Sequence, residues 1–92
     1  MTGVCAYNDD VALAVLAGLR ELGLSAPGDL AVVGVDDVPA ARLAFPPLTT
    51  VTSGQSVIAD HLARSIVAAL AGKPAPRRPA SDIVQLVRRA SA

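Results

Sequence analysis

Apolar residues along the chain occur in short blocks that polar residues, glycines and prolines separate. Residues 3–7, GVCAY, form a brief apolar run that indicates a buried strand. Asn8-Asp9-Asp10 follows at once and supplies a residue suited to cap a helix. A helix is predicted over residues 9–22, DDVALAVLAGLREL, because Gly23 provides a stop signal. Its apolar positions surround most of the helix, so one face is expected to pack on a sheet and another on a separate surface.

The second apolar block, residues 30–35, is continuous rather than alternating. Such a run is typical of a parallel strand that helices cover on both faces. Strand, helix and strand in this order predict a βαβ unit, and therefore an α/β fold with a parallel sheet. Pro39, Pro46 and Pro47 argue against a regular helix or a central strand over residues 36–47.

The second half of the chain predicts three further elements. Residues 48–51 are compatible with a brief extended piece, and a helix is expected from Ser53 or Gly54 to residue 70 or 71. The proline-rich connector KPAPRRPAS then leads to a final strand over residues 82–89. Apolar residues at four-residue steps give the helix a stripe, formed by Ile58, Leu62, Ile66 and Leu70.

Composition indicates one small domain or a piece of a larger one. Of 92 residues, 52% are hydrophobic and 17% are charged, and the formal net charge is zero. A single domain of this length cannot bury all the apolar surface that such a composition provides. Part of that surface is therefore expected to be covered by a partner. The zero net charge argues against general binding to nucleic acid or membrane. The charges are uneven, since six of the eight acids lie in residues 1–37 and seven of the eight bases in residues 38–92.

The low cysteine content and the lack of a signal-peptide pattern favour a cytoplasmic location. The single cysteine, Cys5, excludes an internal disulfide, and a reducing cytoplasm is the expected compartment. Within its strand, Cys5 is predicted to be a small buried hydrophobic residue. No apolar run is long enough to cross a membrane, and the first residues lack a signal-peptide pattern, so no membrane association is expected.

Polar residues follow two of the predicted strands, at the edge where parallel α/β sheets bind ligands. Asn8 comes after the first strand, and Asp36 and Asp37 come directly after the second. If these strands are neighbours, an amide and carboxylates converge there and offer the donors and acceptors that hold hydroxyl groups of a sugar or polyol. Each also has a plainer interpretation, because asparagine is a favoured helix cap and aspartates are common in turns.

Other chemistry has little support in the sequence. Paired acids also bind Mg²⁺ or act in acid–base catalysis, but no further ligand set has metal-binding spacing, so neither a metal nor a cofactor is expected. His61 lacks a partner at a catalytic spacing, and Ser53 and Ser56 lack a nucleophile-elbow context. Phosphate-loop, dinucleotide-binding and CxxC motifs do not occur in the sequence. The chain is therefore not expected to be an enzyme.

Three motifs in succession carry a family resemblance. They are NDDVA before the first helix, DLAVVGVDDVP over the second strand, and PPLTTV after the proline-rich loop. With the ending IVQLVRRAS, they closely resemble the C-terminal part of the effector-binding domain of LacI/GalR-family (lac repressor/galactose repressor) transcription regulators. The resemblance implies a periplasmic-binding-protein-like fold, in which two α/β lobes close on a small ligand.

By this resemblance, the chain is a fragment of that fold and a partial effector-binding domain. Residues 1–50 are expected to form a βαβ portion and loop of the C-terminal lobe. Residues 51–80 are expected to be a crossover helix with its connector, and residues 81–92 a returning strand. The helix-turn-helix headpiece that reads DNA is expected to be absent, so DNA would be bound only through a headpiece outside this chain.

The resemblance also implies residue roles. Asn8 and Asp36 match positions that hydrogen-bond effector hydroxyls or polar ring atoms, with Asp37 as their neighbour. Ser53 follows TTV, where a polar ligand contact often lies in the family. The first helix and the segment after the second strand resemble the dimer surface, whose expected residues are Val11, Val15, Leu19, Leu22, Ala40, Leu43 and Phe45.

The leading hypothesis is an effector-binding, dimerising segment of a transcriptional regulator, with a sugar or related polar metabolite as effector. Binding would control DNA binding through lobe closure. Homodimers are expected, including forms that exchange helix 54–71 or strand 82–89 between copies. The alternative is a fragment of a solute-binding protein of a transporter, which shares the fold. An upstream signal peptide would indicate transport, whereas a helix-turn-helix would indicate regulation.

Overall fold

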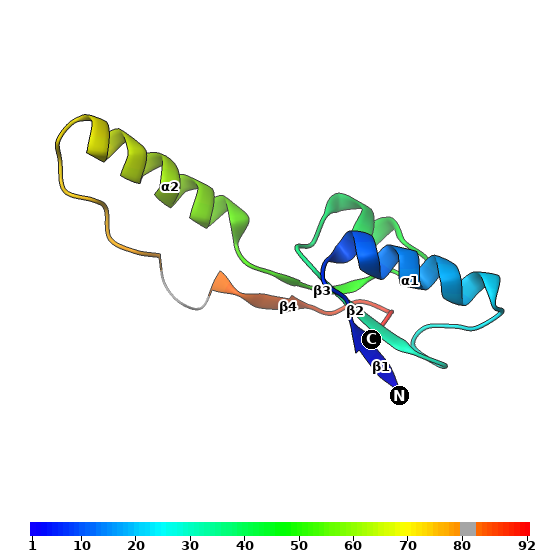
Figure 1. Ribbon diagram of the computed structural model, residues 1–92. Helices are drawn as coiled ribbons and strands as arrows, with labels where there is room; N and C mark the ends of the chain where they lie inside the picture. Colours follow the sequence, from blue (N-terminus) through cyan, green and yellow to red (C-terminus); the bar gives the residue numbers. More distant parts are fainter. Residues whose placement is uncertain (80–82) are drawn as a thin grey trace. The chain divides into compact units, whose positions relative to one another are not determined.

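The computed structural model describes residues 1–79 and 83–92 (Figure 1). Two compact units are distinguished: unit 1 contains Met1–Thr52 and Leu86–Ala92, and unit 2 contains Ser53–Gln85. The predicted boundary at residues 80 and 81, and the predicted strand start at residue 82, lie outside the described residues.

The sheet has the strand order β1-β2-β3-β4. Cys5 of β1 lies opposite Val33 of β2, and Gly34 of β2 lies opposite Thr50 of β3, both in parallel pairings. The predicted α/β class, βαβ unit and parallel sheet are therefore confirmed. The strands are β1 (Gly3–Cys5), β2 (Ala31–Val35), β3 (Thr49–Thr52) and β4 (Gln85–Val87).

Helix α1, Asp9–Glu21, packs on one face of the strands in unit 1 (Figure 1). Asn8 begins it as the cap, because its Oδ1 accepts a hydrogen bond from the Val11 N–H at 2.9 Å. The predicted helix is confirmed to within one residue at its end. The buried core combines α1 and β2 with residues from the connecting segments: Ala6, Ala12, Leu16, Leu19, Val32, Ala41 and Leu48.

Two predictions of burial are wrong. Burial along β2 alternates, because Val32 and Gly34 are buried and the other three residues of the strand are half-buried. The expected cover on both faces is therefore not observed in unit 1. Cys5 is exposed rather than buried. It belongs to β1, the first strand in the sheet order, where only Val4 of the three strand residues packs against the core.

The segment between β2 and β3 contains a short 3₁₀ helix, η1, Pro39–Leu43. Pro39 lies in its first turn, where a missing N–H removes no intrahelical hydrogen bond. This position explains how a proline-rich stretch that excludes a regular α-helix still forms one tight turn. Ala41 of η1 is buried in the core, and its carbonyl accepts a hydrogen bond from the Leu48 N–H at 2.8 Å.

Unit 2, Ser53–Gln85, contains the helix α2, Gln55–Leu70. The helix begins after Gly54, whose φ of 62° is a left-handed conformation that glycine adopts without strain. No residue of α2 is buried, and Leu62, Ile66 and Leu70 of the predicted stripe are exposed. Neither α1 nor α2 has the length and apolar character that a membrane-crossing helix needs, and the rest of the described chain holds no other candidate.

Candidate functional site

The carboxyl ends of β1 and β2 lie side by side, which brings the polar residues that follow them to one edge of the sheet. Cys5 pairs with Val33, and Asn8 and Asp36 each follow three residues later. The sequence prediction required these two strands to be neighbours, and they are. Ligands of parallel α/β sheets bind outside this edge.

The side-chain oxygen of Asn8 is engaged in the fold, whereas its side-chain nitrogen is available for other contacts. Its Oδ1 caps α1, so the plainer of the two interpretations, a helix cap, is confirmed. Among the described residues, none accepts a hydrogen bond from its Nδ2 group. A capping asparagine therefore still presents two N–H donors at this edge.

Asp36 and Asp37 form a turn with an unusual backbone. The φ angle is 109° at Asp36 and 56° at Asp37, positive values that residues other than glycine rarely adopt. The Asp36 N–H donates to the Val51 carbonyl at 2.7 Å, which attaches the turn to β3. Strained backbone of this kind gathers at functional sites and persists only where surrounding contacts hold it.

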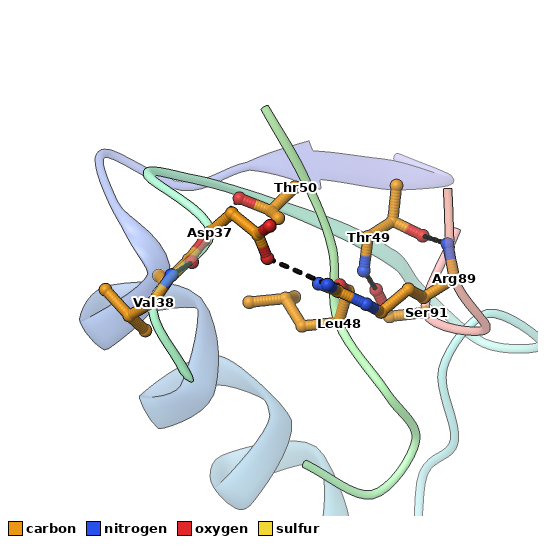
Figure 2. Close-up of polar contacts among 8 residues, drawn as sticks. Asp37, Val38, Leu48, Thr49, Thr50, Arg89 and Ser91 are labelled. Carbon is orange, nitrogen blue, oxygen red and sulfur yellow. Dashed lines mark hydrogen bonds and ion pairs between the residues drawn. The ribbon is translucent and has the colours of Figure 1, made fainter. Parts of the chain in front are cut away.

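Asp37 forms an ion pair with the C-terminal segment. Its Oδ1 lies 2.8 Å from Nη2 of Arg89. Figure 2 marks this ion pair with a dashed line. Nη1 of the same guanidinium donates to the Leu48 carbonyl at 2.9 Å. The predicted ligand role of Asp37 stays a prediction, and its carboxylate already has a structural partner. A pocket of about 210 Å³ adjoins this pair and is lined by Asp37, Val38, Pro39, Arg42 and Arg89.

Asp9 is a buried carboxylate that connects three segments, a role that the sequence analysis missed. It is 0% exposed. Its Oδ1 accepts a hydrogen bond from the Thr50 hydroxyl at 2.6 Å, and its Oδ2 accepts one from the Val38 N–H at 2.8 Å. Gly34 leaves the space for it, because a Cβ at that position would collide with the carboxylate. A glycine inside an apolar strand signals such a close approach and was the available clue.

Ser91 is a second buried polar residue that the sequence analysis missed. Its hydroxyl accepts a hydrogen bond from the Thr49 N–H at 2.8 Å (Figure 2) and donates one to the Val32 carbonyl at 2.6 Å. The Ser91 carbonyl accepts from the Val32 N–H at 2.8 Å. The C-terminal segment thus inserts where β2 and β3 begin and satisfies backbone groups that the two strands leave unpaired.

Ser53, the remaining predicted ligand residue, belongs to unit 2. Asn8 and Asp36 belong to unit 1, and the role of Ser53 stays a prediction. Within the described ranges, no group of three or more histidine, cysteine, aspartate or glutamate residues is arranged to hold a metal ion.

The residues predicted for a dimer surface differ in exposure. Leu19 is buried in the core at 9%, and Val15 packs against that core. Arg20 connects α1 to the segment after η1, because its Nη2 donates to the Phe45 carbonyl at 2.9 Å and its guanidinium carbon lies 5.4 Å from the Phe45 ring centroid. The exposed members of the predicted set are Val11, Leu22, Ala40, Leu43 and Phe45.

Comparison with known proteins identifies the family. Residues 1–92 match the periplasmic binding protein-like domain. The chain belongs to the periplasmic binding protein-like domain family. The HTH-type transcriptional regulator MalR of Streptomyces coelicolor is 36% identical over 90 residues, which cover 98% of this chain and 26% of MalR. The HTH-type transcriptional regulator GalR of Escherichia coli K12 is 33% identical over 90 residues, with the same coverage of 98% and 26%.

Solved structures of this domain family have the same fold. The transcriptional regulator CelR in complex with cellobiose has a TM-score of 0.88 and 34% identity, over 100% of this chain and 28% of that one. A LacI family transcriptional regulator from Lactobacillus casei with bound sucrose has a TM-score of 0.88 and 31% identity, over 99% of this chain and 33% of that one.

These relatives confirm the resemblance to LacI/GalR-family regulators and the periplasmic-binding-protein-like fold. The named proteins are transcriptional regulators, which agrees with the prediction that the chain is not an enzyme. The chain spans 26% of the length of MalR and of GalR, so the activity of a whole regulator remains a proposal for it.

Proposed function

We propose that the chain is the effector-binding and dimerising segment of a LacI-family transcriptional regulator, with a sugar or related polar metabolite as effector. The observation that carries this proposal is the position of Asn8 and Asp36 at the ends of two adjacent parallel strands. An amide donor and a carboxylate acceptor together match the two hydrogen-bonding roles of a hydroxyl group. Sugar-bound regulators among the structural neighbours support the choice of ligand class.

In an intact regulator, effector binding between two lobes would shift their closure and thereby bias DNA-binding headpieces. Such coupling requires only a rigid-body change with two states of different affinity. Because MalR and GalR are helix-turn-helix-type regulators, DNA contact is assigned to a headpiece and the working compartment to the cytoplasm. The same relatives favour this function over that of a transporter's solute-binding protein.

Replacing Asp36 by asparagine tests the binding edge. The unmodified chain is expected to bind at least one of cellobiose, sucrose and glucose weakly, with a Kd in the millimolar range, or about −4 kcal/mol. Asp36→Asn exchanges a charge-assisted hydrogen bond for a neutral one, so binding is expected to weaken about tenfold. Saturation-transfer difference NMR suits such affinities, in phosphate buffer because one structural neighbour holds Tris.

Glu21→Gln is the matched control, because it removes an exposed carboxylate at the far end of α1. It is expected to bind sugar as the unmodified chain does. Equal weakening in both variants, or no weakening in Asp36→Asn, contradicts the assignment of the edge. No signal from any of the three sugars contradicts the ligand class.

The second part of the proposal is a homodimer formed through unit 1. Leu43 and Phe45 are each 79% exposed, and exposed apolar residues gathered on one surface indicate association. Arg20 fixes Phe45 through its carbonyl and its ring, so this part of the surface is ordered before contact. Of the seven residues predicted for the interface, Val15 and Leu19 would support the surface from beneath rather than contact the partner.

Leu43→Glu is expected to convert dimers to monomers at micromolar concentration in sedimentation velocity. A carboxylate in an apolar interface loses its hydration without gaining a partner, which weakens association by about tenfold or more. Leu70→Glu is the matched control on α2, where Leu70 is 85% exposed. If Leu70→Glu dissociates the dimer and Leu43→Glu does not, the interface lies on α2, as the helix-exchanged alternative requires.

A further inference from the structure

The turn that presents Asp36 is held by three separate segments of unit 1. Two consecutive left-handed aspartates form it, a conformation that needs outside support. β3, the C-terminal segment and α1 each contribute one contact to residues 36–38. The contacts are the Asp36 N–H to the Val51 carbonyl at 2.7 Å, Asp37 to Arg89 at 2.8 Å, and the Val38 N–H to Asp9 at 2.8 Å.

Among the three anchors, Asp9 is the side chain with the most constrained surroundings. It is 0% exposed, and the Thr50 hydroxyl at 2.6 Å fixes the oxygen that Val38 does not use. Neither of the two ion pairs in the described chain includes Asp9, so its two hydrogen bonds and its place in the first turn of α1 compensate its burial. A carboxylate without a cation is costly to bury, and an apolar side chain would fill the space beside Gly34 at lower cost. The carboxylate is needed because the Val38 N–H needs an acceptor there.

Asp9 is also covalently adjacent to the other proposed ligand residue. Asn8 caps α1 and presents its amide at the sheet edge, and Asp9 is the first residue of the same helix. The start of one helix therefore fixes Asn8 directly and reaches the Asp36-Asp37 turn through Val38. A single rigid element thus sets both hydrogen-bonding groups of the proposed site.

We infer that Asp9 is a positioning residue of the effector site, which acts by holding the Val38 N–H and so keeps Asp36 in the backbone conformation that presents its carboxylate beside Asn8. This inference rests on the proposed function of Asp36. Asp9 itself does not touch the effector, because both of its oxygens are engaged inside the fold.

Four substitutions separate this role from simple packing. Asp9→Ala removes both hydrogen bonds. Asp9→Asn retains both, because the amide oxygen accepts from Val38 and the NH₂ group donates to a Thr50 hydroxyl that turns to accept. Asp10→Ala, at the exposed next position, is the matched control. Thr50→Val keeps the shape of the side chain and removes one of the two donors to Asp9.

The first readout needs no ligand. In Asp9→Ala, amide exchange at Val38 is expected to be at least about tenfold faster, because a hydrogen bond to a carboxylate is lost. Scalar couplings and intraresidue NOEs should show that Asp36 leaves its positive φ. Asp9→Asn and Asp10→Ala should preserve both signals. An Asp9→Ala protein that keeps the positive φ and the protected Val38 amide overturns the inference, whatever its sugar binding.

Thr50→Val carries the same test if Asp9→Ala does not fold. Without the Thr50 hydroxyl, Oδ1 of Asp9 has no partner and the carboxylate is free to rotate. The hydrogen bond to the Val38 N–H is then weakened but not lost. Amide exchange at Val38 should therefore rise about threefold, less than the roughly tenfold rise expected for Asp9→Ala. Exchange at the core residue Leu16 should stay unchanged. Unchanged exchange at Val38 in Thr50→Val overturns the inference.

The second readout is binding of cellobiose by saturation-transfer difference NMR. Thr50→Val is expected to weaken binding several-fold in the unmodified chain. In an Asp36→Asn background it is expected to weaken binding by less than about twofold, because the effects of substitutions in residues that act together are not additive. Equal weakening in both backgrounds overturns the inference, since Asp9 would then act without Asp36. If Asp36→Asn alone leaves binding unchanged, the proposed function fails, and the exchange measurement still decides the role of Asp9.

Discussion

Gly34→Ala is expected to destabilise unit 1 by about 3 kcal/mol, the upper part of the range for overpacking a filled core. The new Cβ would collide with the Asp9 carboxylate and would lie 3.2 Å from the Asp9 Cα and 3.0 Å from Leu48 Cδ2. β2 has a paired strand on each side, so the backbone has little freedom to move away. Urea denaturation followed by circular dichroism measures the free energy of unfolding.

Gly18→Ala is the matched control for that measurement. Gly18 lies inside α1, and a Cβ there would have nothing within 4 Å. Alanine in a helix interior is expected to stabilise the protein by about 0.5–1 kcal/mol relative to glycine. Two alanine variants of equal stability would contradict the close approach of Asp9 to β2.

Removal of Ser91 and Ala92 is expected to lower the free energy of unfolding by about 3 kcal/mol, a large effect for two terminal residues. Ser91 is 0% exposed, and its loss leaves the Val32 N–H and carbonyl and the Thr49 N–H without their partners. Each buried polar group left unpaired costs about 1–3 kcal/mol, which water reduces where it enters. The midpoint of urea denaturation reports the change.

Ser56→Ala is the control for this truncation, because Ser56 is an exposed serine of α2. Its substitution is expected to change stability by less than about 0.5 kcal/mol. A truncated chain as stable as the full chain would show that the contacts of Ser91 with Val32 and Thr49 do not stabilise the beginnings of β2 and β3.

Local patterns were sufficient to predict β1, α1 and β2 of unit 1. The apolar block at residues 30–35, the cap at Asn8 and the stop at Gly23 lie close to the ends of β2 and α1. The order of these elements predicted a parallel βαβ unit, and the observed pairing of β1 with β2 meets the condition under which Asn8 and Asp36 come to one edge. Each of these inferences uses residues close together in the sequence.

The roles of Asp9 and Ser91 depend on contacts between distant segments, which single-sequence patterns do not specify. Thr50 is 41 residues from Asp9, and Val32 is 59 residues from Ser91. Cys5 was placed incorrectly for a related reason. An apolar run predicts burial, but the position of β1 at one end of the strand order decides which of its residues are covered.

One ion pair connects the acidic first part of the chain to its basic second part. Acids gather in residues 1–37 and bases in residues 38–92, and the ion pair of Asp37 with Arg89 joins the two regions. This pair lies at the turn that presents Asp36. The C-terminal segment therefore contributes to the same edge that the first helix sets through Asp9.

We propose that the edge formed by Asn8 and Asp36 binds a sugar-like effector. Titration of the ¹⁵N-labelled chain with cellobiose, followed in ¹⁵N–¹H correlation spectra, tests it most directly. We expect the largest chemical-shift changes at the amides of Asn8, Asp36 and Asp37. Largest changes at Arg20, Leu24 and Phe45, which line a separate pocket of about 330 Å³, would contradict it.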